Sequence, residues 1–337
     1  MKYIRFSELL GRKVIETDGG RIVNKFSIKS RRNVLFFADI LANYVKRCED
    51  AGFAEEIGSI GYDWTLLSVQ ELMPKTISIM PASLKMGILR NIWINIGALT
   101  DLKFSHDGDA ITLVTKNEMV REIIGNNHYS TESFRGIIAG LFKKETETVS
   151  VEWTDPVCTY RFRLLGAPAG RIDSKSKDAY NRMNYRYSLG SYSMENAIKD
   201  ELFKIKGNRL HFRESPMFMT ESTLYHIISS RGPELGSIPT IAKKYFDTHI
   251  QHTSTIGKLL MIKNLLHVSG WGMVNVITDE NKITFSINNP PYGLQKPADS
   301  WSFLIATILG YLWTIDENYV QTDQSFVSDT IKTVFEI

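Results

Sequence analysis

The chain has 337 residues, of which 43% are hydrophobic and 23% are charged, and its formal net charge is +3. This length suits two domains, and the 17 Phe, 14 Tyr and 6 Trp exclude a largely disordered chain. Two cysteines exclude a disulfide-rich or multi-cysteine zinc fold. The net charge is too small to support nucleic-acid binding by itself, and we do not expect a nucleic-acid partner.

Apolar spacing predicts four helices in the first half of the chain. The first covers about residues 33–49, with Asn33 as its N-cap, and the second covers 64–73, ending before Pro74. The third ends at Gly97, a residue type that tolerates a left-handed C-cap. Its apolar positions lie at helical spacing: Leu84, Ile88, Ile92, Trp93 and Ile96. The fourth contains the segment FRGIIAGLF, which begins at Phe134.

Two strand pairs accompany these helices. Residues 102–105 and 111–115 alternate around an Asp-Gly turn, the strongest short hairpin signal. Residues 149–153 and 159–164 form the second predicted pair. The sequence therefore predicts an α+β unit in which a helical bundle packs on a small antiparallel sheet.

The second half repeats this order, with a helix ending at Gly270, strands near 278–281, a helix over 301–312 and strands up to residue 337. LRNIWINIGALTDLKF, from Leu89, matches IKNLLHVSGWGMVNVI, from Ile262, so that Gly97 aligns with Gly270. We also aligned Gly140 with Gly310 and, upstream, Gly61 with Gly232. The alternative is that generic patterning produced two similar helix-strand-strand units.

From this match we predict two tandem copies of the same domain, related by an approximate two-fold axis. The copies are expected over residues 1–165 and 200–337, and residues 166–199 are expected to be a linker. The linker is rich in Gly, Ser, Asn and Tyr and has neither helical nor strand periodicity.

The order of helices, hairpin and Gly-containing late helix resembles the 4-vinyl-reductase domain, a family also described as predicted hydrocarbon-binding proteins. The residues that carry the resemblance are IGYDWTLL at Ile60, RGPELG at Arg231, FRGIIAGLF and LIATILGYL. The family is related to the haem nitric-oxide-binding domain and to core subunits of vesicle-tethering complexes. Many members carry a cysteine pair near the last hairpin. This chain has only Cys158 there, so a metal site of the family type is not expected.

No catalytic or cofactor motif is found in the sequence. There is no phosphate loop, dinucleotide fingerprint or nucleophile elbow, so we predict a non-catalytic protein without a cofactor or metal. His249 and His252 could share a helix face, but further metal ligands are scarce. The chain has no uncharged stretch of about 18 residues, and Arg5 and Glu8 interrupt any apolar leader. We expect no membrane span and a cytoplasmic location.

Aromatic side chains on the helices predict a ligand pocket. Trp64 and Trp93 are expected to line it in the first copy, with a counterpart near His267 and Trp271 in the second. The first functional hypothesis is a protein that holds a small apolar or aromatic ligand there and responds to it. The alternative is an adaptor whose two copies form a pseudo-dimeric scaffold for a protein partner or a homodimer.

Overall fold

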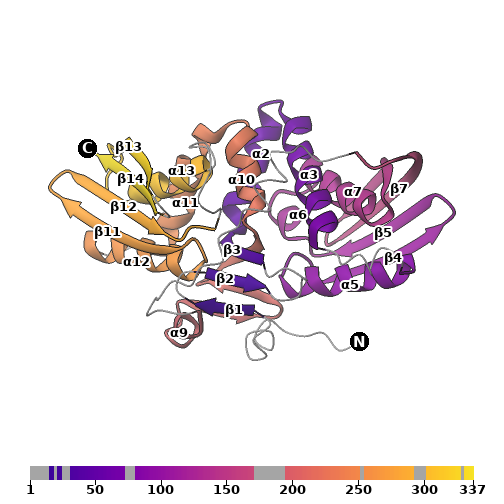
Figure 1. The fold of residues 1–337 in the computed structure, drawn as a ribbon, viewed down its shortest axis with the longest axis horizontal. Coiled ribbons are helices and arrows are strands. Elements are labelled where there is room, and N and C mark those ends of the chain that lie inside the picture. The colour runs from indigo at the N-terminus through magenta and orange to yellow at the C-terminus, as the bar shows by residue number, and fades with distance from the viewer. Residues whose placement is uncertain are drawn as a thin grey trace.

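The structure is a computed structural model that describes residues 15–18, 21–24, 31–72, 80–170, 194–250, 254–291, 301–327 and 330–337. A six-stranded sheet lies between two four-stranded sheets, and helices fill the space around them (Figure 1). All strand pairs recorded in the three sheets are antiparallel. The predicted α+β class is confirmed.

Each half of the chain contributes three strands to the six-stranded sheet. The sheet order is β1 (Ile15–Asp18), β2 (Arg21–Asn24), β3 (Arg31–Phe37), β10 (Ser215–Glu221), β9 (Arg209–Phe212) and β8 (Phe203–Lys206). The two halves meet where β3 pairs with β10, and the register of this pairing is centred on Leu35 opposite Met219. Backbone hydrogen bonds therefore join the halves at the middle of the molecule.

The first half continues from β3 through three helices into a sheet of order β4-β5-β7-β6. Its elements are α2 (Ala38–Asp50), α3 (Ala54–Leu72), α5 (Ala82–Asn95), β4 (Asp101–Asp107), β5 (Ala110–Lys116), α6 (Met119–Ile124), α7 (His128–Phe142), β6 (Lys144–Thr154) and β7 (Val157–Pro168).

The second half has the same strand order in its own sheet, β11-β12-β14-β13. The short helix α9 (Met194–Lys199) precedes β8. After β10 come α10 (Thr223–Arg231), a 3-10 turn at Leu235–Ser237, α11 (Ile238–Ile250), α12 (Thr255–Val268), β11 (Met273–Asp279), β12 (Lys282–Asn288), α13 (Ser302–Leu312), β13 (Val320–Val327) and β14 (Thr330–Glu336).

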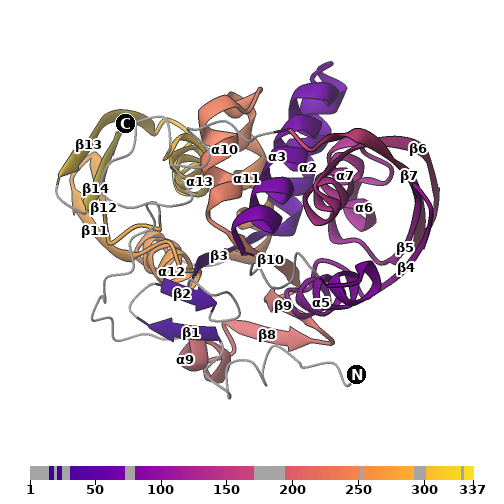
Figure 2. The ribbon, with the colours of Figure 1, turned by 45° about the vertical axis from the view of Figure 1, so that its right-hand side comes forward.

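Helices from the two halves pack reciprocally at the centre. Helices α2, α3, α10 and α11 stand between the two four-stranded sheets (Figure 2); α2 packs on α11, and α10 packs on α3. The Tyr44 hydroxyl donates to the Pro233 carbonyl oxygen at 2.6 Å, and Arg231 pairs with Asp63 at 2.5 Å. Each half therefore covers part of the other.

The first predicted helix is wrong at its start. Residues 31–37 form β3, and Asn33 lies within this strand rather than at a helix N-cap. Residues 33–37 are all buried, so the strand shows no alternation of polar and apolar residues. The apolar residues of the strand continue into α2 at helical spacing, so the sequence pattern does not separate the strand from the helix.

Other boundaries agree more closely. Gly97 and Gly270 have φ of +77° and +87° and follow α5 and α12, as predicted for C-terminal caps. The second helix starts earlier than predicted, because α3 already begins at Ala54.

The upstream alignment is wrong: Gly61 lies inside α3, whereas Gly232 directly follows α10. Of the expected linker, β7 includes residues 166–168 and α9 includes 194–199, and residues 171–193 lie outside the described residues.

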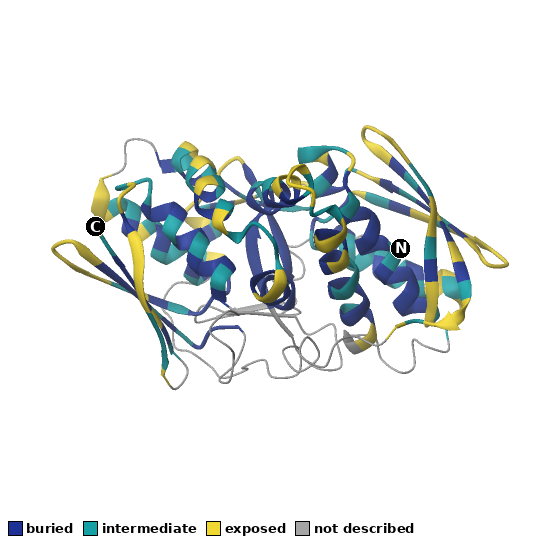
Figure 3. Ribbon diagram, turned by 90° about the horizontal axis from the view of Figure 1, so that it is seen from above, coloured by how far each residue is buried: buried dark blue, intermediate teal, exposed yellow. Residues whose placement is uncertain are grey.

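The hydrophobic core of the described residues has two parts. The larger cluster joins the central sheet, α2, α10 and the second half, and the smaller one lies between the helices and sheet of the first half. Figure 3 shows buried residues along the central helices and exposed residues at the tips of the outer hairpins. The second half thus shares its core with the centre of the molecule, whereas the first half has a core of its own.

Candidate functional site

A small hollow lies between α3, α5, α6 and α7 of the first half and β10 of the second half. The hollow is partly open to solvent, and its volume is about 60 Å³. Its walls are mainly apolar and come from Trp64, Trp93, Ile96, Ala98, Leu99, Glu118, Met119, Val120, Tyr129, Ser130, Ser133, Phe134 and Phe218. The structure therefore brings Trp64 and Trp93 to one cavity.

The cavity lies where the two hydrophobic clusters meet. Trp64, Tyr129 and Phe218 belong to the larger cluster, and Leu99 and Phe134 belong to the smaller one. Apolar side chains pack continuously within each cluster. The cavity therefore lies where the side chains of the two clusters do not pack closely against each other.

Aromatic rings form opposite walls of the cavity. The ring of Trp64 meets Phe218 edge-on, with 6.2 Å between ring centroids, and Trp93 lies 4.8 Å from Phe134. Trp64 is 9% exposed, whereas Trp93 is only half-buried. Trp93 is therefore the more exposed of the two tryptophans that line the cavity.

Two buried donors of the cavity walls lack satisfactory partners. Among the described residues, the indole N–H of Trp64 has no hydrogen-bond acceptor. The Tyr129 hydroxyl lies beside the Ser133 hydroxyl without a well-directed hydrogen bond to any described residue. Burial raises the pKa of Tyr129, so this group stays protonated and remains a donor. Leaving a buried donor unpaired costs about 1–3 kcal/mol, which an acceptor on a bound molecule would recover.

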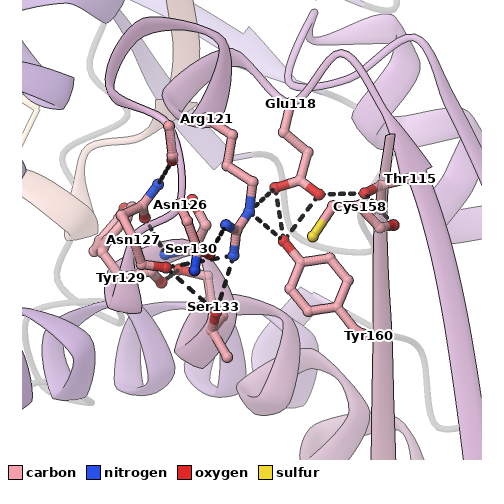
Figure 4. A network of polar contacts seen from close by, with 12 residues as sticks. Thr115, Glu118, Arg121, Asn126, Asn127, Tyr129, Ser130, Ser133, Cys158 and Tyr160 are labelled. Carbon is pink, nitrogen blue, oxygen red and sulfur yellow. Dashed lines mark hydrogen bonds and ion pairs between the residues drawn. The ribbon is translucent and has the colours of Figure 1, made fainter. Parts of the chain in front are cut away.

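A buried polar network borders the cavity at Glu118 (Figure 4). The Glu118 carboxylate accepts from the Thr115 and Tyr160 hydroxyls and from Arg121 Nε, the last at 3.1 Å. The remaining Arg121 nitrogens donate to Asn126, Asn127 and Thr131. Burial raises the pKa of Glu118, and the Arg121 charge opposes this shift. Because its members are mutually bonded, the network fixes α6 and α7 against β5 and β7 rather than offering free groups to a ligand.

The start of α7, which carries Tyr129, is held by two side chains. Asn127 caps the helix by accepting from the Ser130 amide at 2.8 Å. Glu49, at the end of α2, accepts from the His128 amide at 2.7 Å and from the Tyr129 amide at 3.4 Å. A carboxylate is favourable at a helix N-terminus, so the cavity wall is tied to the central helix α2.

Glycines set the close approach of α3 and α7. A Cβ on Gly136 would collide with the carbonyl oxygen of Tyr62, and one on Gly61 would lie 2.8 Å from the carbonyl oxygen of Tyr129. In the second half, a Cβ on Gly310 would collide with the carbonyl oxygen of Pro239 on α11. The structural counterpart of Gly310 is therefore Gly136, not Gly140 as the sequence alignment had it.

The predicted counterpart site in the second half is not assembled in the same way. Trp271 is buried in the core, and its indole N–H donates to the Leu35 carbonyl oxygen at 3.3 Å. His267 lies half-buried in the last turn of α12. The two residues do not join Trp64 and Trp93, which lie in the first half.

Sequence reasoning missed several residues that line the cavity. Phe218 comes from the other half of the chain, through a strand that was not predicted. Glu118 and Arg121 are three residues apart, an i,i+3 pair that could have been noticed. Tyr129 follows an Asn-His pair at the start of α7, where a capping signal was available in Asn127.

The described residues contain no group of three or more His, Cys, Asp or Glu side chains placed to hold a metal ion. His249 Nε2 lies 2.7 Å from the Ser215 hydroxyl, and His252 is outside the described residues. Both cysteines are buried, and burial raises the pKa of Cys48 and of Cys158 to about 11. None of the described helices is long and apolar enough to cross a bilayer.

The chain was compared with models of protein families and with curated protein sequences. No model of a protein family matches the chain, and no curated protein matches its sequence. The resemblance to the 4-vinyl-reductase domain therefore stays a prediction.

Proposed function

We propose that the first half of the chain binds a small, largely apolar molecule that carries a hydrogen-bond acceptor, in the cavity between Trp64 and Trp93. The observation that carries this proposal is that Trp64 lines an apolar cavity and that its buried indole N–H has no acceptor among the described residues. Apolar walls with a few polar groups are typical of small-molecule sites.

The size of the cavity limits the ligand. An apolar cavity of about 150 Å³ is enough for benzene, so the 60 Å³ here admits a ring only if one wall moves. The ring of Trp93 is half-buried, and we propose that it turns outward when a ligand enters. Binding would then change the environment of Trp93, which gives a readout for a sensor or regulator. The resemblance to predicted hydrocarbon-binding proteins supports the same class of ligand.

The test uses three probes of similar size: toluene, acetophenone and benzoate. Acetophenone adds a carbonyl acceptor to the ring, and benzoate adds a charge that the apolar walls cannot solvate. We expect acetophenone to bind about fivefold tighter than toluene, because a hydrogen bond that contributes about 1 kcal/mol lowers the Kd by that factor. Benzoate should bind weakest of the three. Heteronuclear NMR should show the indole N–H signal of Trp64 shifting with acetophenone but little with toluene.

Trp64→Phe is the matched variant, because it keeps an aromatic ring and removes the donor. It should remove the part of the advantage of acetophenone over toluene that the Trp64 donor provides, while leaving toluene binding nearly unchanged. Native mass spectrometry of the freshly purified chain would show whether a ligand is retained and would give its mass. Absence of binding by all three probes would contradict the proposal.

A second candidate function, a scaffold for protein partners, is favoured by one observation. Ile256 and Leu260 lie four residues apart on α12 and are 72% and 53% exposed. Neighbouring apolar side chains on one helix face are typical of a contact surface.

A further inference from the structure

The helices α5 and α12 end in the same way. The Ala98 amide donates to the Trp93 carbonyl oxygen at 3.0 Å, and the Trp271 amide donates to the Leu266 carbonyl oxygen at 3.2 Å. In both turns the glycine between them, Gly97 or Gly270, has positive φ and donates to the residue three positions earlier. This is the hydrogen-bond pattern of a Schellman cap.

This shared cap fixes which residues correspond, independently of sequence similarity. Trp93 corresponds to Leu266, and Ala98 corresponds to Trp271. Each half therefore has one tryptophan among these two positions, but at opposite ends of the cap.

The helices that face these caps also correspond. In α7 the Ser133 hydroxyl donates to the Tyr129 carbonyl oxygen at 2.8 Å, and in α13 the Thr307 hydroxyl donates to the Phe303 carbonyl oxygen at 2.8 Å. Gly136 and Gly310, three residues further along, make the equivalent close approach to α3 and α11. The cavity residue Tyr129 thus has Phe303 as its counterpart.

In the second half these positions enclose the ring of Trp271. Trp271 is 1% exposed, and its ring lies 5.4 Å from Tyr225 and 6.2 Å from Phe36. Phe303 lies 5.1 Å from Phe36 and 5.2 Å from Tyr225, so it belongs to the same cluster. The Trp271 indole N–H also has an acceptor, the Leu35 carbonyl oxygen, whereas Trp64 has none among the described residues.

We infer that the ring of Trp271 occupies the space in the second half that corresponds to the ligand cavity of the first half. The two residues at the two ends of this cap determine whether that space is open in each half. Trp93 with Ala98 leaves the space open, and Leu266 with Trp271 fills it. This inference deepens the proposed function, because it names a planar aromatic molecule of up to indole size as the ligand class of the first half. It also makes Ala98 and Trp93 the residues that determine the permitted size.

Exchange of the two pairs tests this inference. Trp93→Leu/Ala98→Trp gives the first half the pair found in the second, and Leu266→Trp/Trp271→Ala does the reverse. Ala98→Trp alone should overpack the site and lower the thermal midpoint, whereas adding Trp93→Leu should restore most of the loss. The double variant should no longer bind acetophenone.

The reverse exchange should open a second site, so that indole binds with two equivalents per chain instead of one and raises the midpoint of this variant. Ile138→Trp, on the buried face of α7, is the control for a tryptophan placed where the counterpart, Leu312, is not a tryptophan, and Trp93→Leu should not rescue it. If Trp93→Leu fails to rescue Ala98→Trp, the correspondence is wrong. If it does rescue but the wild type binds no probe, the correspondence holds and only the proposed function fails.

Discussion

The two halves of the molecule use the same strand order and the same helix ends but fill the space between helices and sheet differently. In the first half a cavity separates two hydrophobic clusters, and beside it lies a buried polar network. In the second half an aromatic cluster around Trp271 makes the core continuous with the central sheet. One backbone frame can therefore support either a cavity or a packed core, depending on a few ring positions.

The largest expected effect comes from truncating the tryptophan of the filled half. Trp271→Ala should lower the free energy of unfolding by about 3–5 kcal/mol, because it removes a buried ring and leaves a cavity. Trp93→Ala should cost clearly less, since Trp93 is half-buried beside existing space. Urea denaturation of both variants checks the contrast. Equal costs would show that Trp93 is ordinary core and that the two halves do not differ in this way.

Breaking the polar network should lower the free energy of unfolding by a comparable amount, and the effects of its two charged residues should be coupled. Arg121→Met leaves the buried Glu118 without its cation, so we expect a loss of about 3–5 kcal/mol in the free energy of unfolding. Removing both charges, with Glu118→Leu/Arg121→Met, should recover most of that loss. A double-mutant cycle measured by urea denaturation gives the coupling. Additive costs would mean that the pair does not act as a unit.

The separate core of the first half should also open more easily. Cys158 belongs to the smaller cluster and Cys48 to the larger one, and burial keeps both thiols protonated at neutral pH. Pulse labelling with a thiol reagent at increasing urea should therefore modify Cys158 before Cys48. Single variants, Cys48→Ala and Cys158→Ala, assign the signals. Simultaneous labelling would indicate one cooperative unit and would remove the distinction between the two cores.

The smallest expected effect concerns the surface of the second half. Leu260→Lys should change the free energy of unfolding by no more than about 0.5 kcal/mol, because the side chain is mostly exposed. If α12 is a contact surface, the same change should shift the molar mass measured by light scattering toward that of a monomer. Lys263→Ala, on the same helix, is the control for a change of charge.

Much of the local structure could be predicted from sequence. Glycine at the ends of α5 and α12 and the Asp-Gly turn between β4 and β5 depend on neighbouring residues, so short patterns report them. Trp64 and Trp93 were predicted to share a cavity because both lie on helices that cover the sheet of the same half. These features need no knowledge of the other half.

The remainder depends on contacts between distant parts of the chain. The strand β3 is buried on both sides by elements of both halves, which removes the alternation that would identify it. The buried ring of Trp271 packs against Phe36 and Tyr225, and neither residue is near it in sequence. The same limit applies to Phe218, which reaches the cavity of the first half from β10.

The pairing of β3 with β10 has a consequence for how the protein is made. Leu35 must wait for a partner strand that leaves the ribosome about 180 residues later, which takes roughly 10–40 s at 5–20 residues per second. During that interval the hydrogen-bonding edge of β3 and the apolar side of α2 lack the partners that cover them in the finished protein. The nascent chain therefore exposes a strand edge prone to incorrect pairing, and its yield in cells should depend on chaperones that bind such edges.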